Sequence, residues 1–274
     1  MTAIVFERII KSDKNTDKED KMNENVQREE NMNQITKETF EFLWFSYFGI
    51  TVETAKGMDS DELIKICTKR AYLDMCRTLR FTEDGDNNSK EENGRETFRD
   101  DIICNVILKM IKDCIFKSSE SSFDGIHKTI CEEIKTRANR KDDVKILKVD
   151  FTYGQAQKWL NMTIKYMYLM GFWKDKFEKI EKVLHVPVDS YIIQAVWKTN
   201  VFLPLKNEKV NRQSAYSDEK VVSWSQWDDT MYDDFQTSLK KYINDETPYG
   251  TPLEWEAEAW IEVAERIKNK QKKD

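Results

Sequence analysis

Apolar residues recur every three to four positions along most of the chain, and this spacing predicts helices. In residues 60–80, Leu63, Cys67, Ala71 and Met75 follow one another in steps of four, so one helix face would carry all of them. A crowded apolar stretch from Phe40 to Phe48 predicts an earlier helix that ends at Gly49. Further helices are predicted over residues 95–117, 122–138, 154–171 and 174–184, after Asp189, after Ser225 and after Thr251. The pattern therefore predicts an all-α fold of roughly eight or nine helices.

Helix start signals support these boundaries. Asp189 follows Pro187, which does not continue a helix easily, and stands at the N-cap position of the next apolar run. Thr251, Pro252 and Glu254 occupy the N-cap, N1 and N3 positions of the last helix. Residues 200–222 lack a periodic pattern and are predicted to form loops.

The N-terminal residues differ from the rest in composition. Residues 11–34 contain almost no apolar side chains, so they cannot bury enough surface to offset the entropy cost of ordering. We therefore predict a flexible, disordered polar tail over residues 1–34. Residues 35–274 are predicted to form a helical domain, either as one body or as two lobes with a cleft near residues 151–190.

Bulk composition limits the environment of the protein. The sequence is 39% apolar and 34% charged, with only 8 Gly and 4 Pro, which agrees with long helices. No apolar run is long enough to cross a bilayer, so we expect no membrane association and a cytoplasmic location. Five cysteines without a C-x-x-C pair are expected to be reduced and mostly buried. Two histidines give no metal-ligand spacing, and no cofactor is predicted.

Charge is unevenly distributed. The net charge is −6, which argues against DNA binding by the whole surface. Residues 151–210 nevertheless carry nine lysines against five acidic residues, whereas residues 211–274 carry nine basic and fourteen acidic residues. The central segment is the part with a basic excess, and it could face a polyanion.

Two loop-to-helix junctions in that segment suggest chemistry. In the sequence Phe151-Thr-Tyr-Gly-Gln-Ala-Gln-Lys158, a Gly opens a turn and Lys158 lies just inside the new helix. Backbone amides at such a helix start are suited to binding phosphate. Val-Pro-Val-Asp189-Ser190 forms the second junction. A lysine on one helix and an aspartate that caps another can face a common cleft.

These residues resemble the catalytic centre of the helix-hairpin-helix DNA glycosylases. The hairpin of that family reads Gly-x-Gly-x-Lys and is followed by Val-Asp-Thr. Gly154 and Lys158 match the hairpin, with Ala156 in place of the second Gly, and residues 188–190 read Val-Asp-Ser. The wide gap between Lys158 and Asp189 is similar to that in the archaeal-type 8-oxoguanine DNA glycosylases. The resemblance covers about forty residues and lacks the Leu-Pro that precedes the hairpin in the family.

The resemblance implies a fold, an activity and a partner. The helices would adopt a helix-hairpin-helix glycosylase-like arrangement, and the partner would be double-stranded DNA, from which a damaged base flips into a pocket. Lys158 would attack C1′ of the deoxyribose and form a Schiff base. Asp189 would stabilise the cationic sugar and position Lys158.

Binding roles follow from the same resemblance. The amides of Gly154, Gln155 and Ala156 would hold a backbone phosphate of the DNA. Aromatic side chains would stack on the base, with Phe151, Trp159 and Trp44 as candidates by residue type.

Simpler interpretations stand beside these roles. Lys158 could be a surface lysine and Asp189 an N-cap only, while aromatic residues such as Trp159 usually lie in a core. His185 would then be a packed loop residue. A non-enzymatic helical interaction or accessory protein, which binds a protein partner through its acidic C-terminal half, is the alternative function. No motif in the sequence supports a nuclease or a phosphate-loop nucleotide-binding protein.

Overall fold

Helices make up the regular secondary structure of the described residues, apart from two isolated bridges. The computed structural model describes residues 37–82, 94–140 and 146–272. The bridges join Phe81 to Leu147 and Leu205 to Val221. The predicted all-α fold is therefore confirmed, while the predicted flexible tail over residues 1–34 lies outside the described residues.

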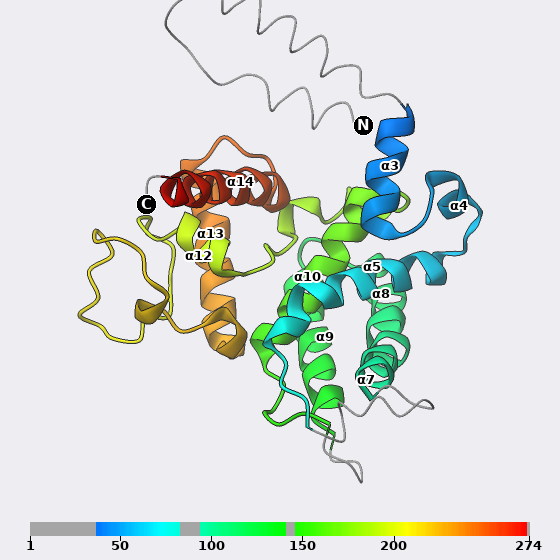
Figure 1. Ribbon diagram of the computed structural model, residues 1–274, viewed down its shortest axis with the longest axis horizontal. Coiled ribbons are helices and arrows are strands. Elements are labelled where there is room, and N and C mark those ends of the chain that lie inside the picture. Colours follow the sequence, from blue (N-terminus) through cyan, green and yellow to red (C-terminus); the bar gives the residue numbers. More distant parts are fainter. Residues whose placement is uncertain (1–36, 83–93, 141–145, 273–274) are drawn as a thin grey trace, which may run out of the picture. The chain divides into compact units, whose positions relative to one another are not determined.

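The α-helices follow the predicted order (Figure 1). Their bounds are α3 Lys37–Phe48, α4 Val52–Gly57, α5 Ser60–Met75, α7 Gly94–Ile102, α8 Leu108–Asp113, α9 Phe123–Ala138, α10 Tyr153–Met170, α11 Lys174–Phe177, α12 Ser190–Ala195, α13 Asp229–Glu246 and α14 Pro252–Gln271. Short 3-10 turns cover Cys76–Thr78, Ile115–Lys117, Glu181–Val183, Asp218–Lys220 and Trp224–Gln226.

The described chain divides into two units between Gly57 and Met58. The first unit contains α3 and α4, which are joined where the Val52 amide donates to Glu41 Oε1 at 2.7 Å. The second unit contains every helix from α5 onward. The predicted domain of residues 35–274 with two lobes stays a prediction.

Two predicted helices have different internal structures. The run predicted over residues 95–117 contains a π-helical segment, Ile103–Ile107, between α7 and α8. The run predicted over residues 174–184 consists of the four-residue α11 and the later 3-10 turn Glu181–Val183. Neither of those short pieces has a side-chain hydrogen bond at its N-cap, so local capping does little to extend them.

Helix α10 is central to the second unit because α5 and α9 both pack against it (Figure 1). The face of α10 that meets α5 contains Trp159, Tyr166 and Met170, which recur at helical spacing. Trp159 is fully buried, and its Nε1–H donates to the carbonyl of Thr68 at 3.0 Å. This interface fixes α10 as a rigid base for the residues on its other side.

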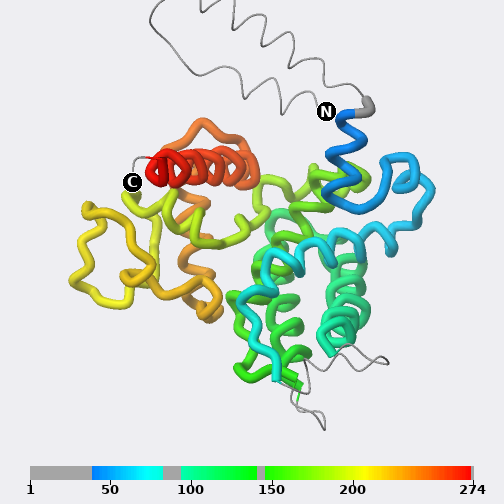
Figure 2. The backbone as a smooth tube through the Cα atoms, viewed as in Figure 1, coloured from blue at the N-terminus to red at the C-terminus, as the bar shows by residue number. Residues whose placement is uncertain are grey.

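Irregular segments connect the remaining helices. Leu184–Asp189 leads into α12, and α12 packs on α14. Residues 196–228 run between α12 and α13 as loops and short turns, which Figure 2 draws mostly in yellow. The predicted loop over residues 200–222 is confirmed. The last part of this connection reaches the start of α10, where the carbonyl of Trp227 accepts from the amide of Gly154 at 2.9 Å.

Candidate site where helices α10 and α12 begin

Helix α10 begins one residue before Gly154. Thr152 is its N-cap, and a capping box joins the Thr152 hydroxyl to the Gln155 amide and the Gln155 side chain to the Thr152 amide. The Thr152 hydroxyl also donates to the carbonyl of Ser225 at 2.6 Å. The helix start is therefore fixed by its own cap and by the segment before α13.

Lys158 and Asp189 are brought together, as the resemblance implies. Lys158 Nζ donates to Asp189 Oδ2 at 3.0 Å across 31 residues of sequence. The Lys158 side chain is only 5% exposed, whereas that of Asp189 is 21% exposed. A buried ammonium needs a counter-charge. Loss of Asp189 would therefore leave Lys158 buried and unpaired, whereas loss of Lys158 would leave a carboxylate that water can reach.

Asp189 has two structural functions at once. Its Oδ1 accepts from the amides of Tyr191 and Ile192, which makes Asp189 the N-cap of α12 and confirms the predicted cap. Its Oδ2 holds Lys158. Each carboxylate oxygen therefore has a fixed task, and the cap sets the orientation in which the other oxygen meets the amine.

The first amides of α10 already have partners inside the chain. Gly154 N–H donates to Trp227, Gln155 N–H donates to the Thr152 hydroxyl, and all three of the residues predicted to bind phosphate are buried. A Cβ at Gly154 would lie 2.0 Å from the Trp224 carbonyl oxygen. Glycine at this position thus permits close packing of residues 224–227. Phosphate binding by the amides of Gly154, Gln155 and Ala156 would require that segment to move.

The predicted stacking residues are arranged differently from one another. Trp159 and Phe151 lie in the core, with rings packed against Tyr72 at 5.1 Å and Phe98 at 6.3 Å. They do not face the Lys158–Asp189 pair from an open surface. Trp44 belongs to α3 in the first unit, and its assignment to a base pocket stays a prediction.

A second ion pair and an exposed aromatic pair lie on the same helices. Lys165 of α10 binds Glu256 of α14, whose side chain is 3% exposed. One helical turn beyond Glu256, Trp260 stacks on Tyr191 with ring centroids 4.7 Å apart and planes 12° apart. Trp260 is 40% exposed. Both contacts depend on the packing of α14 against α10 and α12. The sequence pattern does not specify this packing, so it does not predict these neighbours of the Lys158–Asp189 pair.

A buried chain of hydrogen bonds lies beside this site and was missed by the sequence analysis. Asn161 Nδ2–H donates to Gln157 Oε1 at 3.0 Å and to the Tyr232 hydroxyl at 2.8 Å. Asn161 Oδ1 pairs with His127 Nε2 at 2.7 Å, and the Tyr232 hydroxyl pairs with His185 Nδ1 at 2.8 Å. The one available signal was the polar series 157, 161 and 165 on an otherwise apolar helix.

The hydrogen-bond partners in this chain indicate one consistent assignment of its protons. Because the amide of Asn161 donates to the Tyr232 oxygen, the tyrosine is free to donate its own proton to His185 Nδ1. His185 Nε2–H then donates to Asp124 Oδ1 at 2.8 Å, which also accepts from Lys240 at 2.7 Å. Every donor in this chain faces an acceptor when both histidines are neutral and carry the proton on Nε2.

Burial and partners shift the pKa values of the chain's groups. Burial is the largest cause that lowers the pKa of His127 and of His185 below the usual value. Burial also raises the pKa of the Tyr232 hydroxyl. The hydrogen bond from His185, together with that from Lys240, lowers the pKa of Asp124 well below its usual value. These shifts favour neutral histidines, a protonated Tyr232 hydroxyl and an ionised Asp124.

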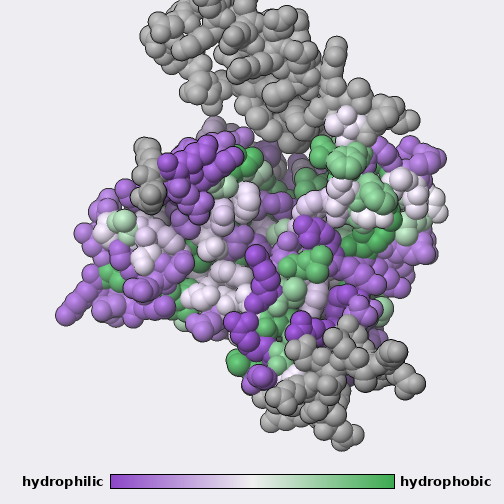
Figure 3. Space-filling model, in the orientation of Figure 1, coloured by the Kyte–Doolittle hydropathy of each residue, from purple (hydrophilic) through white to green (hydrophobic). Residues whose placement is uncertain are grey.

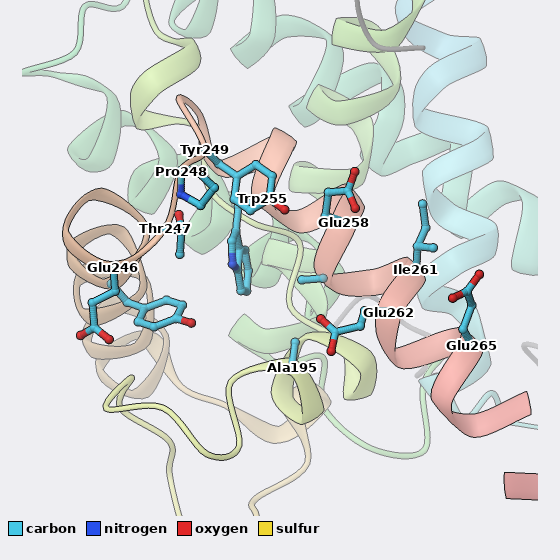
Figure 4. A pocket seen from close by; sticks show the side chains of 12 residues that line it. Ala195, Glu246, Thr247, Pro248, Tyr249, Trp255, Glu258, Ile261, Glu262 and Glu265 are labelled. Atoms are coloured by element: carbon cyan, nitrogen blue, oxygen red, sulfur yellow. The ribbon is translucent and has the colours of Figure 1, made fainter. Parts of the chain in front are cut away.

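An acidic pocket of about 400 Å³ lies among α12, α13 and α14 (Figure 4). Four carboxylates line it together with aromatic rings, and Lys158 and Asp189 are not among its residues. Its acidic and aromatic lining consists of Glu246, Glu258, Glu262, Glu265, Tyr242, Tyr249 and Trp255. Figure 3 shows mostly hydrophilic residues along α14.

Neither a metal-ligand cluster nor a membrane-spanning helix is found in the part of the chain that the structure describes. Within it, no three His, Cys, Asp or Glu side chains are grouped so that they could hold a metal ion. No described helix is both long and apolar enough to span a bilayer. Comparison with models of protein families, with curated proteins and with solved structures gives no match to this chain.

Proposed function

We propose that this protein is a DNA N-glycosylase/lyase that excises a damaged base through a Schiff base on Lys158. The observation that carries the proposal is the 3.0 Å contact between the amine of Lys158 and a carboxylate oxygen of Asp189. A shielded amine beside a fixed carboxylate is the pair that such chemistry requires. The glycosylase-like arrangement of the helices is part of the same proposal.

The proposed reaction assigns one task to each side chain. The Lys158 ammonium first gives one proton to water, and the resulting amine forms a bond to C1′ while the bond from C1′ to the base nitrogen breaks. The base leaves with the bonding electron pair and takes up a proton that the amine releases, and opening of the sugar gives the Schiff base. Asp189 stabilises the positive charge that develops on the sugar. Because Asp189 is the more exposed partner, the sugar would approach along its side of the pair.

Surface features support DNA as the partner. Exposed lysines of the central segment, such as Lys179 and Lys182, can attract phosphates without sequence preference. The exposed Trp260 stacks on Tyr191, which lies two residues after Asp189, and offers an aromatic surface there. A flat base can stack on such a surface. We include Trp260 among the base-contacting candidates in place of the buried Trp159 and Phe151.

The test uses duplexes that each contain one oxidised, alkylated or deaminated base. Wild-type protein is expected to release at least one of these bases and to cleave the strand there. Lys158→Met should lose both steps, while Asp189→Asn should keep DNA binding and slow base release. A protein that binds none of the duplexes and releases no base would contradict the proposal.

A second candidate, a helical interaction protein, is favoured by the acidic pocket. Its four glutamates would attract a protein segment rich in lysine or arginine. Salt-dependent binding of an oligolysine peptide, weakened in Glu258→Gln and Glu262→Gln, would support this function. A cytosolic location suits either candidate, and all five cysteines are free thiols in the structure.

A further inference from the structure

The segment Leu184–Asp189 belongs to no helix or strand, and its residues 184–188 are buried. Val186 and Val188 are both 0% exposed. Buried backbone N–H and C=O groups need hydrogen-bond partners, and Pro187 has no N–H to contribute. The segment must therefore find partners for Val186 and Val188 among side chains.

Two buried glutamine side chains supply these partners. Gln236 of α13 donates from Nε2 to the carbonyl of Val186 at 2.7 Å and accepts the Val186 amide at 3.3 Å. Gln157 of α10 makes the equivalent pair with Val188, at 3.5 Å to the carbonyl and 3.4 Å from the amide. Each glutamine amide thus replaces one residue of a neighbouring strand.

The amide of Gln157 has a fixed orientation. Its Nε2 donates to the carbonyl of Gly154 at 3.0 Å, and its Oε1 accepts from Asn161 Nδ2 at 3.0 Å. If the amide were flipped, its NH2 group would face the NH2 group of Asn161, and its oxygen would face the carbonyl oxygen of Gly154. Contacts within α10 therefore set the orientation in which the Gln157 amide meets Val188.

We propose that Gln157 is a positioning residue that sets Asp189 at the correct distance from Lys158. Gln157 and Lys158 are neighbours on α10, and they bind the neighbours Val188 and Asp189 of the segment. Two consecutive cross-contacts fix both the position and the register of the segment against α10. The consequence for catalysis rests on the proposed function, whereas the positioning of Asp189 does not.

Gln236 provides a matched control for a merely structural role. Gln157→Met and Gln236→Met each remove one amide that holds two backbone groups of the same segment. Both variants are expected to lose stability because they leave buried backbone groups unpaired. Only Gln157→Met also releases the residue next to Asp189.

The first measurement is the acylation rate of individual lysines, followed by mass spectrometry on the full chain. Lys158 is protected in the wild type by burial and by Asp189. In Gln157→Met its labelling should rise about tenfold, as in Asp189→Ala, while Gln236→Met should change it less than about twofold. Lys165 is the internal reference because its partner is Glu256. Equal rates for Lys158 in all variants, or an equal rise in both glutamine variants, would overturn the proposal.

A second measurement decides the case in which Gln157→Met fails to fold. In the wild type, the amide of Val188 should exchange with deuterium as slowly as the amide of Val186, because each is buried and bonded to a glutamine. Rapid exchange at Val188 alone would show that Gln157 does not hold the segment, and would overturn the proposal.

Borohydride trapping on lesion-bearing DNA separates the two proposals. If wild type forms an adduct, Gln157→Met should slow its formation about tenfold with unchanged DNA affinity, and Gln236→Met should not. Trapping that is equally fast in Gln157→Met would contradict the positioning role. Absence of any adduct in the wild type would refute the glycosylase function, and the lysine labelling would still decide the role of Gln157.

Discussion

The two faces of α10 are buried by different means. Toward α5, Trp159 packs its ring on Tyr72 and Met170 meets Cys67, so contact area dominates. On the other side, Gln157, Lys158, Asn161 and Lys165 are buried or nearly so, and each has a particular hydrogen-bond partner. The first face tolerates many apolar residues of similar size, while the second depends on individual atoms.

The two faces of α10 differ in what they contribute to the protein. A helix needs only one apolar face to be held in place, and α5 supplies the matching surface. Burying amines and amides on the other face does not add stability in proportion, because desolvation opposes every polar contact. The polar face is therefore the part of α10 where a chemical role is expected.

The largest effect is expected on the apolar face. Trp159→Ala should lower the free energy of unfolding by about 3 to 5 kcal/mol, because it opens a cavity against Tyr72 and leaves the carbonyl of Thr68 without its donor. Urea denaturation followed by circular dichroism measures this loss. Trp260→Ala is the control on the exposed side, and a loss as large as that of Trp159→Ala would contradict the contrast between the faces.

The ion pair should respond asymmetrically to the loss of each partner. Asp189→Ala leaves the ammonium of Lys158 buried without a counter-charge and removes the cap of α12, so about 3 kcal/mol should be lost. Lys158→Met leaves a carboxylate that is 21% exposed and still caps α12, so less than about 1.5 kcal/mol should be lost. Urea denaturation measures both losses. If the two variants lost the same unfolding free energy, the burial of Lys158 would not be the cause of the asymmetry.

Gly154 tests the contact between the start of α10 and the segment before α13. Gly154→Ala should cost about 2 kcal/mol, because its Cβ would meet the Trp224 carbonyl oxygen at 2.0 Å and residues 224–227 would have to shift. Thermal unfolding measures the loss. Gly125→Ala is the matched control, since nothing lies within 4 Å of a Cβ there. Increased stability in Gly154→Ala would contradict the close packing.

Acid should weaken the buried hydrogen-bond chain gradually. Both histidines have pKa values below 6.5 in the folded protein, so below pH 6.5 the unfolded chain takes up protons that the folded chain does not. The contribution of the two histidines to stability is therefore complete above pH 6.5. It is lost as the pH falls below 6.5, by at most about 1.4 kcal/mol per pH unit for each histidine, until the pH reaches the folded pKa of that histidine. The lowered pKa of Asp124 adds a further loss below its unfolded value of 3.8.

A variant separates the histidine contribution from other acid effects. His127→Gln should reduce the slope between pH 6.5 and pH 5, since one of the two titrating groups is gone. Urea midpoints measured across this pH range provide the slope. A slope that does not change in His127→Gln would show that His127 is not held neutral in the folded protein.

The sequence predicts local features of the site better than its tertiary contacts. Thr251 and Asp189 are recognisable as N-caps because a cap depends on a few adjacent residues. The packing of residues 224–227 on Gly154 joins positions about seventy residues apart, and no spacing in the sequence indicates it. For the same reason, residue type alone assigned Trp159 to a base pocket, although the structure buries it against α5.

The sequence indicated the Lys158–Asp189 pair itself but not the residues that surround it. Their proximity was expected from a family resemblance over about forty residues, and not from periodicity. The companions of the pair, Gln157 above all, could have been suspected from polar residues on an apolar helix. Their partners Tyr232 and His185 come from other parts of the chain and depend on the fold.

Trapping with borohydride, followed by peptide mapping, tests the central role of Lys158 most directly. Reduction of the Schiff base turns it into a stable bond between protein and DNA. The proposal predicts an adduct with at least one damaged duplex, located on the peptide that contains Lys158 and lost in Lys158→Met. An adduct on another lysine, or no adduct with any of the damaged duplexes, would contradict it.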